Sequence, residues 1–280
     1  MAVILVPTAD RPECVFALDA AFRLAETLDA NVAGCHVRAQ RRERSADASA
    51  RRRVPGAESA GLGPIDSAAA RRLFADAARA HGFAITRRFA TRHRQRAVWH
   101  DLVGSPSHAL GIAGPVADFS VVSRPMPQGG GRAREFLLAA LLDTGRPVLV
   151  LPQRRIRNLA RRVVIAWNQS AEAAAAVTAA VPLLQRAEHV VIMSSGPENR
   201  AGPKSSQLSQ YLATFDVETE CVATRGREAE REIREIYHDV RADLLVMGAY
   251  SRSRLREILF GGVTEHMLFA TNLPVFMLHR

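Results

Sequence analysis

Short runs of consecutive apolar residues alternate along the chain with longer segments whose apolar residues recur every three or four positions. A strand buried on both faces is apolar at every position, whereas a helix packed on a sheet is apolar along one stripe, so the pattern predicts alternating strands and helices. The expected strands are 3–6, 32–37, 83–89, 119–122 and 148–151, followed by 162–167, 189–193, 217–223, 243–247 and 274–278. Four helices are expected in the first half: one that ends at 28, then 68–81, 108–116 and 135–142. Four are expected in the second half: one that begins at 171, then 205–215, 228–240 and 263–270.

This order of elements occurs twice. Residues 3–6 correspond to 163–166, residues 117–123 correspond to 242–248, and each half closes on Pro-Val followed by apolar residues. Strands that alternate with helices imply right-handed crossovers and parallel sheets covered on both faces. We therefore expect an α/β protein with two tandem, doubly wound, parallel five-stranded sheets, in one domain at 1–157 and another at 158–280. The last strand of each half would be an exposed apolar edge if it were unpaired, which sheets avoid.

The composition argues against a membrane protein and against a secreted, disulfide-bonded protein. The 280 residues are 48% hydrophobic and 24% charged, which suits a packed core, and no apolar run is long enough to cross a membrane. The start of the chain lacks the basic leader of a secretory signal, and the three cysteines are too widely spaced for a disulfide framework. We expect a cytoplasmic protein without a membrane contact.

The formal net charge of +10 comes from arginine, because Lys204 is the only lysine. A GC-rich genome explains this skew more simply than nucleic-acid binding, which also lacks a recognisable motif here. Many arginines lie in the run 38–53, which mixes serine and alanine with the charges and predicts a solvated insertion.

The segment after the strand 243–247 is the strongest candidate for chemistry. Gly248 ends the strand, a basic loop with Arg252 and Arg254 follows, and Gly261 and Gly262 open a helix. Glycine lets backbone approach a ligand closely, and the free N–H groups of a helix start attract anions. Parallel sheets bind ligands at this carboxyl edge, so the segment predicts an anion or phosphate site. A tight turn with solvated arginines is the structural alternative.

Here the sequence resembles the universal stress protein family in its tandem form. The nucleotide-binding branch of that family carries Gly, two residues, Gly, nine residues, Gly, then Ser or Thr. Gly248 matches the first glycine, Ser251 replaces the second, Gly261 matches the third, and Gly262 stands at the hydroxyl position with Thr264 two residues beyond. The resemblance implies an adenine nucleotide alpha hydrolase-like fold, antiparallel pairing of the two final strands, and a pseudo-two-fold axis between the halves.

The resemblance also implies ATP as ligand, accompanied by Mg²⁺. The family's acidic residue after the first strand corresponds to Asn168, which hydrogen-bonds but supplies no carboxylate. The nucleotide-binding residues predicted for the second half are Asn168, Gly248, Ser251, Arg252, Arg254, Gly261, Gly262, Val263 and Thr264.

The first half has no equivalent of this pattern. Thr8 stands at the Asn168 position, and counting along the chain from Asp118 places Phe136 where Gly261 would lie. The glycines 129–131 form either an anion cradle or a flexible linker, and the linker is preferred. The first half is therefore expected to be a structural partner whose site is lost or altered.

No catalytic residue or metal site is predicted. His93, His100 and His108 lack the spacing of metal-binding histidines on a helix, and no phosphate loop of the ordinary ATPases is present. Ligand binding would bias conformation or partner contacts in a stress response rather than drive turnover, with slow ATP hydrolysis left open.

Two other functions remain open. A protein of the same fold that binds no nucleotide would act as a scaffold for an unidentified protein partner, and nucleic-acid binding through 38–53 ranks below it. The halves are expected to pair within one chain, and a further homodimer is left open.

Overall fold

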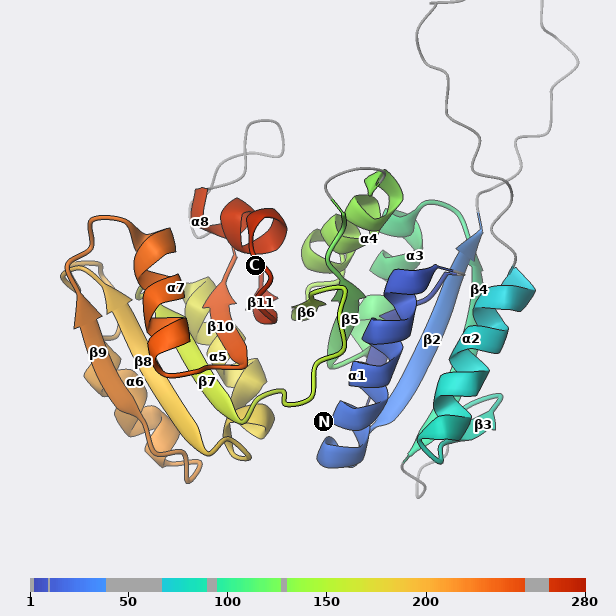
Figure 1. The fold of residues 1–280 in the computed structure, drawn as a ribbon, viewed down its shortest axis with the longest axis horizontal. Helices are drawn as coiled ribbons and strands as arrows, with labels where there is room; N and C mark the ends of the chain where they lie inside the picture. Colours follow the sequence, from blue (N-terminus) through green and yellow to red (C-terminus); the bar gives the residue numbers. More distant parts are fainter. Residues whose placement is uncertain (1–2, 10, 39–66, 90–94, 127–129, 250–261) are drawn as a thin grey trace, which may run out of the picture.

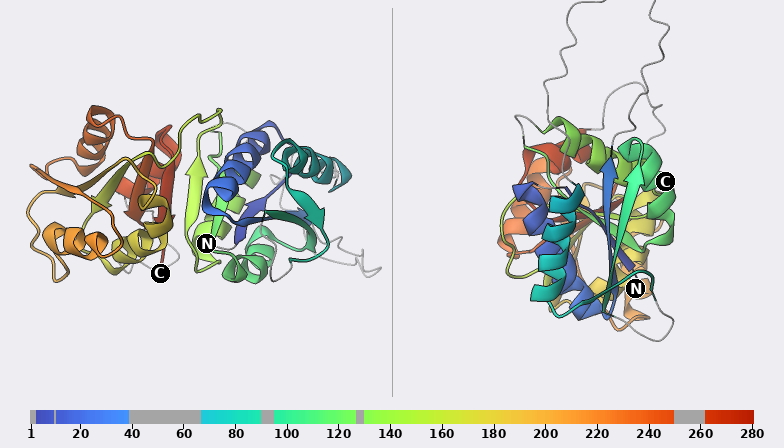
Figure 2. Two further views of the ribbon diagram at one scale, coloured as in Figure 1. Left: turned by 90° about the horizontal axis from the view of Figure 1, so that it is seen from below. Right: turned by 90° about the vertical axis from the view of Figure 1, so that its right-hand side faces the viewer.

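The computed structural model describes residues 3–9, 11–38, 67–89, 95–126, 130–249 and 262–280. Most of the predicted arginine-rich insertion lies outside these residues, as does His93. Figure 1 shows two lobes, each with helices around its strands, and Figure 2 shows them side by side from a second direction.

Eleven strands within the described residues form one continuous sheet. In the N-terminal half (residues 1–157) they are β1 (Val3–Pro7), β2 (Asn31–Arg38), β3 (Ala84–Thr86), β4 (Arg96–Val103), β5 (Phe119–Ser123) and β6 (Val148–Leu151). In the C-terminal half (residues 158–280) they are β7 (Arg162–Trp167), β8 (His189–Ser195), β9 (Glu220–Thr224), β10 (Leu244–Gly248) and β11 (Val275–Leu278).

Apart from the additional edge strand β3, the strand order is the same in both halves and is mirrored about the centre of the sheet. It runs β3-β4-β2-β1-β5-β6-β11-β10-β7-β8-β9. Neighbouring strands within each half are parallel, whereas β6 and β11 are antiparallel, with Leu149 opposite Phe276. The α/β fold and the antiparallel pairing of the final strands are therefore confirmed.

Helices cover both faces of this sheet. They are α1 (Pro12–Leu28), α2 (Ser67–Ala80), α3 (Pro106–Ala113), α4 (Gly131–Leu142), α5 (Ala171–Leu184), α6 (Ser205–Ala213), α7 (Ala229–Asp239) and α8 (Gly262–Glu265), which continues into a π-helical turn at His266–Ala270. The helices α1, α2, α5 and α6 contribute to one hydrophobic cluster, and α3, α4, α7 and the segment 262–270 contribute to the other. The central strands are buried on both faces, which explains their continuous apolar runs.

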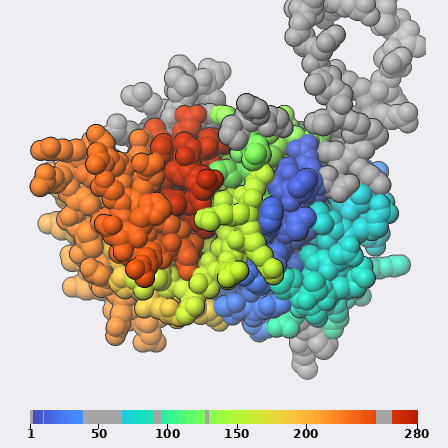
Figure 3. All heavy atoms as spheres, in the orientation of Figure 1, coloured from blue at the N-terminus to red at the C-terminus, as the bar shows by residue number. Residues whose placement is uncertain are grey.

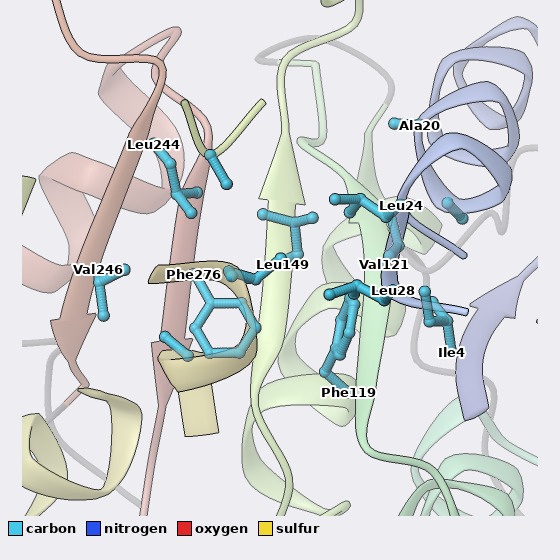
Figure 4. Close-up of a cluster of buried hydrophobic side chains, with 14 of the residues drawn as sticks. Ile4, Ala20, Leu24, Leu28, Phe119, Val121, Leu149, Leu244, Val246 and Phe276 are labelled. Atoms are coloured by element: carbon cyan, nitrogen blue, oxygen red, sulfur yellow. The ribbon is translucent and has the colours of Figure 1, made fainter. Parts of the chain in front are cut away.

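The two halves meet through an apolar junction as well as through the strand pair. Phe119 of β5 and Phe276 of β11 are fully buried, and their rings pack edge to face with centroids 5.6 Å apart. Figure 4 shows these rings beside Leu149 between the two halves. Residues 152–161 join the halves and run over the surface between them (Figure 3), where Arg23 donates to the carbonyl oxygen of Arg157 at 3.0 Å.

The N-terminal half differs from the expectation at its outer edge. The strand that pairs with β2 is β4, which the sequence pattern did not predict, and the expected strand 83–89 is reduced to the short edge strand β3. This half therefore has six strands instead of five. Polar His100 and Asp101 interrupt the apolar pattern of β4 and are exposed near the outer edge of the sheet, so an apolar run did not mark the strand.

Candidate functional site

The predicted site residues that follow β7 and β10 lie on neighbouring strands. The strands are parallel and pair with Met247 opposite Ala166, so the turn that contains Asn168 and the strand end at Gly248 share the carboxyl edge of the sheet. This is the edge at which doubly wound sheets bind ligands. The structure therefore brings Asn168 and Gly248 to one place, as the sequence predicts.

The turn after β7 is fixed by its own polar side chains. Asn168 Oδ1 accepts a hydrogen bond from the Ser170 N–H at 3.2 Å, and Ser170 Oγ accepts one from the Ala173 N–H at 3.1 Å, which caps α5. Gln169 has a φ of 60°, in the left-handed region. Asn168 is half-buried, and one lone pair of its amide oxygen is engaged within the turn.

A second loop lies over this turn. Gln169 is buried and donates from Nε2 to the carbonyl oxygens of Arg200 at 3.2 Å and Gly202 at 2.9 Å. A Cβ on Gly202 would lie 2.1 Å from the Gln169 carbonyl oxygen, so only glycine allows this approach. Trp167 Nε1 donates to the Pro203 carbonyl oxygen at 2.9 Å and anchors the same loop. The loop and the turn form one rigid wall beside Asn168.

Gly248 has a packing role that the sequence did not reveal. A Cβ at this position would lie 2.5 Å from the Ala173 backbone nitrogen and 2.8 Å from the Glu172 carbonyl carbon. The end of β10 therefore packs directly against the first turn of α5, and the glycine is required for this contact.

The start of α8 presents the next part of the predicted site. Gly262 is exposed and Val263 is half-buried, whereas Thr264 is buried with 6% of its surface exposed. Thr264 is thus poorly placed to meet a ligand with its hydroxyl group. Ser251, Arg252, Arg254 and Gly261 lie outside the described residues, so their predicted roles stay predictions.

A carboxylate lies against the start of α8. A Cβ built on Gly262 would be 2.9 Å from Glu230 Oε1, which belongs to the first turn of α7. The positive end of a helix dipole attracts such a group. A phosphate that binds at Gly262 would meet the Glu230 charge unless the side chain moves or a cation lies between them.

A neighbouring carboxylate shapes the adjoining loop. Glu232 Oε2 accepts hydrogen bonds from Ser195 Oγ and Thr224 Oγ1, each at 2.6 Å, and from the Gly226 N–H at 3.2 Å. The two hydroxyl groups and the backbone donors lower the pKa of the Glu232 carboxyl below its ordinary value. Glu232 therefore ties the ends of β8 and β9 to α7.

The N-terminal half contains a cavity at the equivalent edge, which the sequence did not predict. Its volume is about 50 Å³. It is lined by the turn after β1 (Pro7, Thr8, Ala9), the start of α1 (Arg11, Glu13, Cys14, Ala17), the end of β5 (Val122, Ser123) and the first turns of α4 (Arg132, Ala133, Phe136). Most of these lining residues are apolar or small.

The polar groups of this cavity are partly engaged with each other. Arg11 pairs with Glu13 at 3.6 Å, and the Ala9 N–H donates to Cys14 Sγ at 3.4 Å. Arg132 donates from Nη2 to the Val37 carbonyl oxygen at 3.0 Å. Its Nε is buried and has no hydrogen-bond partner within the described part of the chain. The cavity thus combines an apolar wall with a cationic edge.

The predicted correspondence between Thr8 and Asn168 is wrong by one residue. Arg11 and Ser170 are the residues that precede α1 and α5, so Ala9, not Thr8, occupies the Asn168 position. The helix α4 begins at Gly131, so the end of the glycine run leads into a helix.

Other candidate features carry no site. Ser105 caps α3 by accepting from the His108 N–H at 3.2 Å, so its role is to begin a helix. Within the described residues, no group of three or more His, Cys, Asp or Glu side chains is arranged to hold a metal ion. None of the described helices is both long and apolar enough to span a membrane.

Comparison with known proteins gives a family match in the C-terminal half. Residues 160–279 match the model of the universal stress protein family. A universal stress protein of Methanocaldococcus jannaschii is 39% identical over 49 residues, which are 18% of this chain and 30% of that relative's length.

Two solved structures share the fold over the whole chain. A universal stress protein from Archaeoglobus fulgidus superimposes with a TM-score of 0.68 at 14% identity, over 99% of this chain and 98% of its own. A Pseudomonas aeruginosa protein provisionally assigned to the same family gives 0.60 at 14% identity, over 100% of this chain and 93% of its own. At this identity the similarity shows the fold alone, and it extends that fold to both halves.

Proposed function

Since residues 160–279 are a universal stress protein domain, we propose that the C-terminal half binds an adenine nucleotide, ATP with Mg²⁺, as a regulatory ligand in a stress response. The observation that supports this proposal is the placement of Asn168 and Gly248 at the carboxyl edge of two neighbouring parallel strands within the matched domain. The proposed setting is a reducing cytoplasm, in which Cys14, Cys35 and Cys221 stay free thiols.

Each proposed residue has a defined part. The backbone N–H groups of Gly261, Gly262 and Val263 would bind phosphate oxygens at the helix start, and Arg252 or Arg254 would add charge-assisted contacts. The backbone at Gly248 and Ser251 would line the path of the ligand, and the side-chain amide of Asn168 would contact the sugar or base. Thr264, being buried, would support the helix rather than touch the nucleotide.

Glu230 gives Mg²⁺ a physical reason to accompany the nucleotide. Its carboxylate at Gly262 repels a bare phosphate, and a divalent cation between the two groups would remove that repulsion. Magnesium ordinarily binds phosphates together with only one or two carboxylates. Bound ATP would change the conformation of α8 and the contacts of the protein with a partner, without rapid turnover.

The test uses a matched pair of glycine variants. The Cβ of Gly262→Val would lie against the flexible end of Glu230, whereas a Cβ at Gly131, the first residue of α4, meets no atom within 4 Å. The melting temperature of the wild type should rise with MgATP, because a ligand at 100 times its Kd adds about 2.7 kcal/mol to the free energy of unfolding. Gly262→Val should abolish this response and Gly131→Val should retain it.

The cavity of the N-terminal half supports a second candidate function. In this alternative the C-terminal half is a scaffold, and the N-terminal cavity holds a small ligand at the start of α4 near Arg132. Loss of a ligand response in Gly131→Val but not in Gly262→Val would favour it. A wild-type melting temperature that ignores millimolar MgATP would overturn the first proposal.

A further inference from the structure

One arginine of the N-terminal half is inserted into the C-terminal half. Arg124 follows β5, and its N–H donates to the Leu151 carbonyl oxygen at 2.7 Å, which fixes its backbone beside β6. Its side chain is buried, with 5% of the residue exposed. Nε donates to the carbonyl oxygen of Leu268, and Nη2 donates to those of Met267 and Leu273, each at 2.8 Å.

Met267 and Leu268 belong to the π-helical turn that ends the described segment 262–270, and Leu273 lies just beyond that turn. The last carbonyl groups of a helix have no partner within the helix, and a cation at that end is stabilising. Met267 O also accepts from Thr271 Oγ1 at 3.1 Å, but no other donor to the carbonyl oxygens of Leu268 and Leu273 is found among the side chains of the described residues. Removal of the guanidinium would leave two buried acceptors without that donor.

The cost of burying Arg124 is visible in its protonation. Burial lowers the pKa of its guanidinium to about 10, so the side chain stays charged at neutral pH. A buried cation is tolerated when its donors are paired. Nε and Nη2 of Arg124 are paired, whereas Nη1 is buried and has no hydrogen-bond partner among the described residues. Its three side-chain hydrogen bonds all go to the segment 267–273 of the C-terminal half.

A second arginine of the N-terminal half reaches the same segment. The guanidinium carbon of Arg134, on α4, lies 4.4 Å from the centre of the Phe269 ring. Among the described residues, the position in the C-terminal half that corresponds to Arg124 is Ala249. Ala249 makes the same backbone bond as Arg124, to Leu278 O at 2.9 Å, but its methyl group cannot reach across to α4.

We infer that Arg124 is a positioning residue for the ligand site of the C-terminal half. It holds the far end of the segment whose near end presents Gly262 and Val263. The affinity of that site then depends on docking of the N-terminal half. This inference rests on the proposed function for its ligand but not for its structural part.

The experiment compares Arg124→Met, Arg124→Lys and Arg146→Met in the full chain. Arg146 is the matched control, because it donates from Nε and Nη2 to the Pro115 carbonyl oxygen within its own half. Two quantities are measured at a temperature where every variant is folded: the Kd for MgATP by calorimetry, and amide hydrogen exchange across 262–270 without ligand.

Arg124→Met should accelerate exchange selectively in 262–270 and raise the Kd about tenfold, within the usual range of coupling between sites. Arg124→Lys keeps the charge but loses the planar set of guanidinium N–H donors. Its Kd and its exchange rate should therefore lie between those of the wild type and Arg124→Met. Arg146→Met should change neither, even where its melting temperature falls.

Equal effects of Arg124→Met and Arg146→Met would overturn the inference, and so would faster exchange with an unchanged Kd. If Arg124→Met does not fold, the same two quantities are compared between Arg124→Lys and the wild type, and the inference requires both the exchange rate and the Kd to rise. If the wild type ignores MgATP, the proposed function fails, while amide exchange still decides whether Arg124 positions the segment.

Discussion

The ionisable side chains of the interior differ in how they are accommodated. Arg124 is paired with carbonyl oxygens across the junction of the halves, whereas Cys35 on β2 is fully buried and stays uncharged. Burial raises the pKa of the Cys35 thiol from 9.0 to about 12. At the surface, Glu230 brings a charge to a helix start that favours anions. Each of these groups gives a pH- or charge-dependent property that is open to measurement.

Cys35 should reduce stability at alkaline pH. The folded thiol keeps its proton up to about pH 12, and the unfolded thiol loses it above about pH 9. The unfolded state is therefore favoured as the pH rises between these values, by about 1.4 kcal/mol per pH unit for one group. Denaturant unfolding of the wild type and of Cys35→Ala should show this difference in slope. An exposed control, Cys221→Ala, should keep the wild-type slope.

Glu230→Gln should strengthen the binding of ATP in the absence of Mg²⁺. Removing one charge beside a helix start is worth about 0.3–1 kcal/mol, or roughly a two- to fivefold decrease in the Kd. Glu228→Gln, an exposed change one residue before α7, is the control and should have a smaller effect. Weaker binding in Glu230→Gln without Mg²⁺ would contradict the repulsion.

At the scale of elements, contacts between backbones decide what each loop is able to do. The end of β10 lies against the first turn of α5 at Gly248, and the loop at Gly202 lies against the turn at Gln169. These two contacts hold the carboxyl edge of the C-terminal half rigid. The start of α8, by contrast, presents Gly262 to solvent beside the movable side chain of Glu230.

Gly248→Ala should destabilise the C-terminal half. The added Cβ would lie within 3 Å of backbone atoms of Glu172 and Ala173, which cannot rotate away. Overpacking of this kind costs about 1–3 kcal/mol in the free energy of unfolding. Gly131→Ala, whose Cβ meets open space, is the control. Equal stability of the two variants in denaturant unfolding would show that β10 and α5 separate easily.

The sequence predicts elements best where burial is continuous and least well at the sheet edge. The strands β7 and β10 were predicted to within a residue because 163–167 and 244–247 are uninterrupted apolar runs. The strand β4 was not, because its outer residues are polar. The glycines 130 and 131 could not be placed at a helix start from spacing alone, since the two halves differ in the length of the preceding loop.

The candidate site follows the same division. Adjacency of Asn168 and Gly248 follows from parallel pairing, which the pattern predicts. The packing role of Gly248, the burial of Thr264 and the approach of Glu230 depend on tertiary contacts between segments distant along the chain. No pattern within one segment contains that information.

At the scale of the whole molecule, one antiparallel strand pair makes two lobes into a single sheet. The pairing of β6 with β11 covers two apolar edges that would otherwise be exposed. Phe119 and Phe276 fill the space beside it, and Arg124 crosses it. The folding of each half is therefore coupled to the presence of the other.

Phe276→Ala should weaken this coupling. Truncation of a fully buried phenylalanine costs about 3–5 kcal/mol in the free energy of unfolding. The truncation would leave a void between the two halves. We therefore expect the variant to unfold in two thermal transitions, one for each half, where the wild type unfolds in one. Leu142→Ala, at a position that is 44% exposed, should keep the wild-type transition. One sharp transition at a lower temperature would contradict separate unfolding of the halves.

Arg124 and Ala249 are different residues at corresponding positions of the two halves. This difference is possible only where each half has its own coding sequence. A homodimer of single-domain chains has the same amino acid on both sides of its axis, so its interface would have to accommodate two buried guanidinium groups. Joining the copies in one polypeptide removes that constraint. One lobe is thereby free to specialise as a support and the other as the part that is supported.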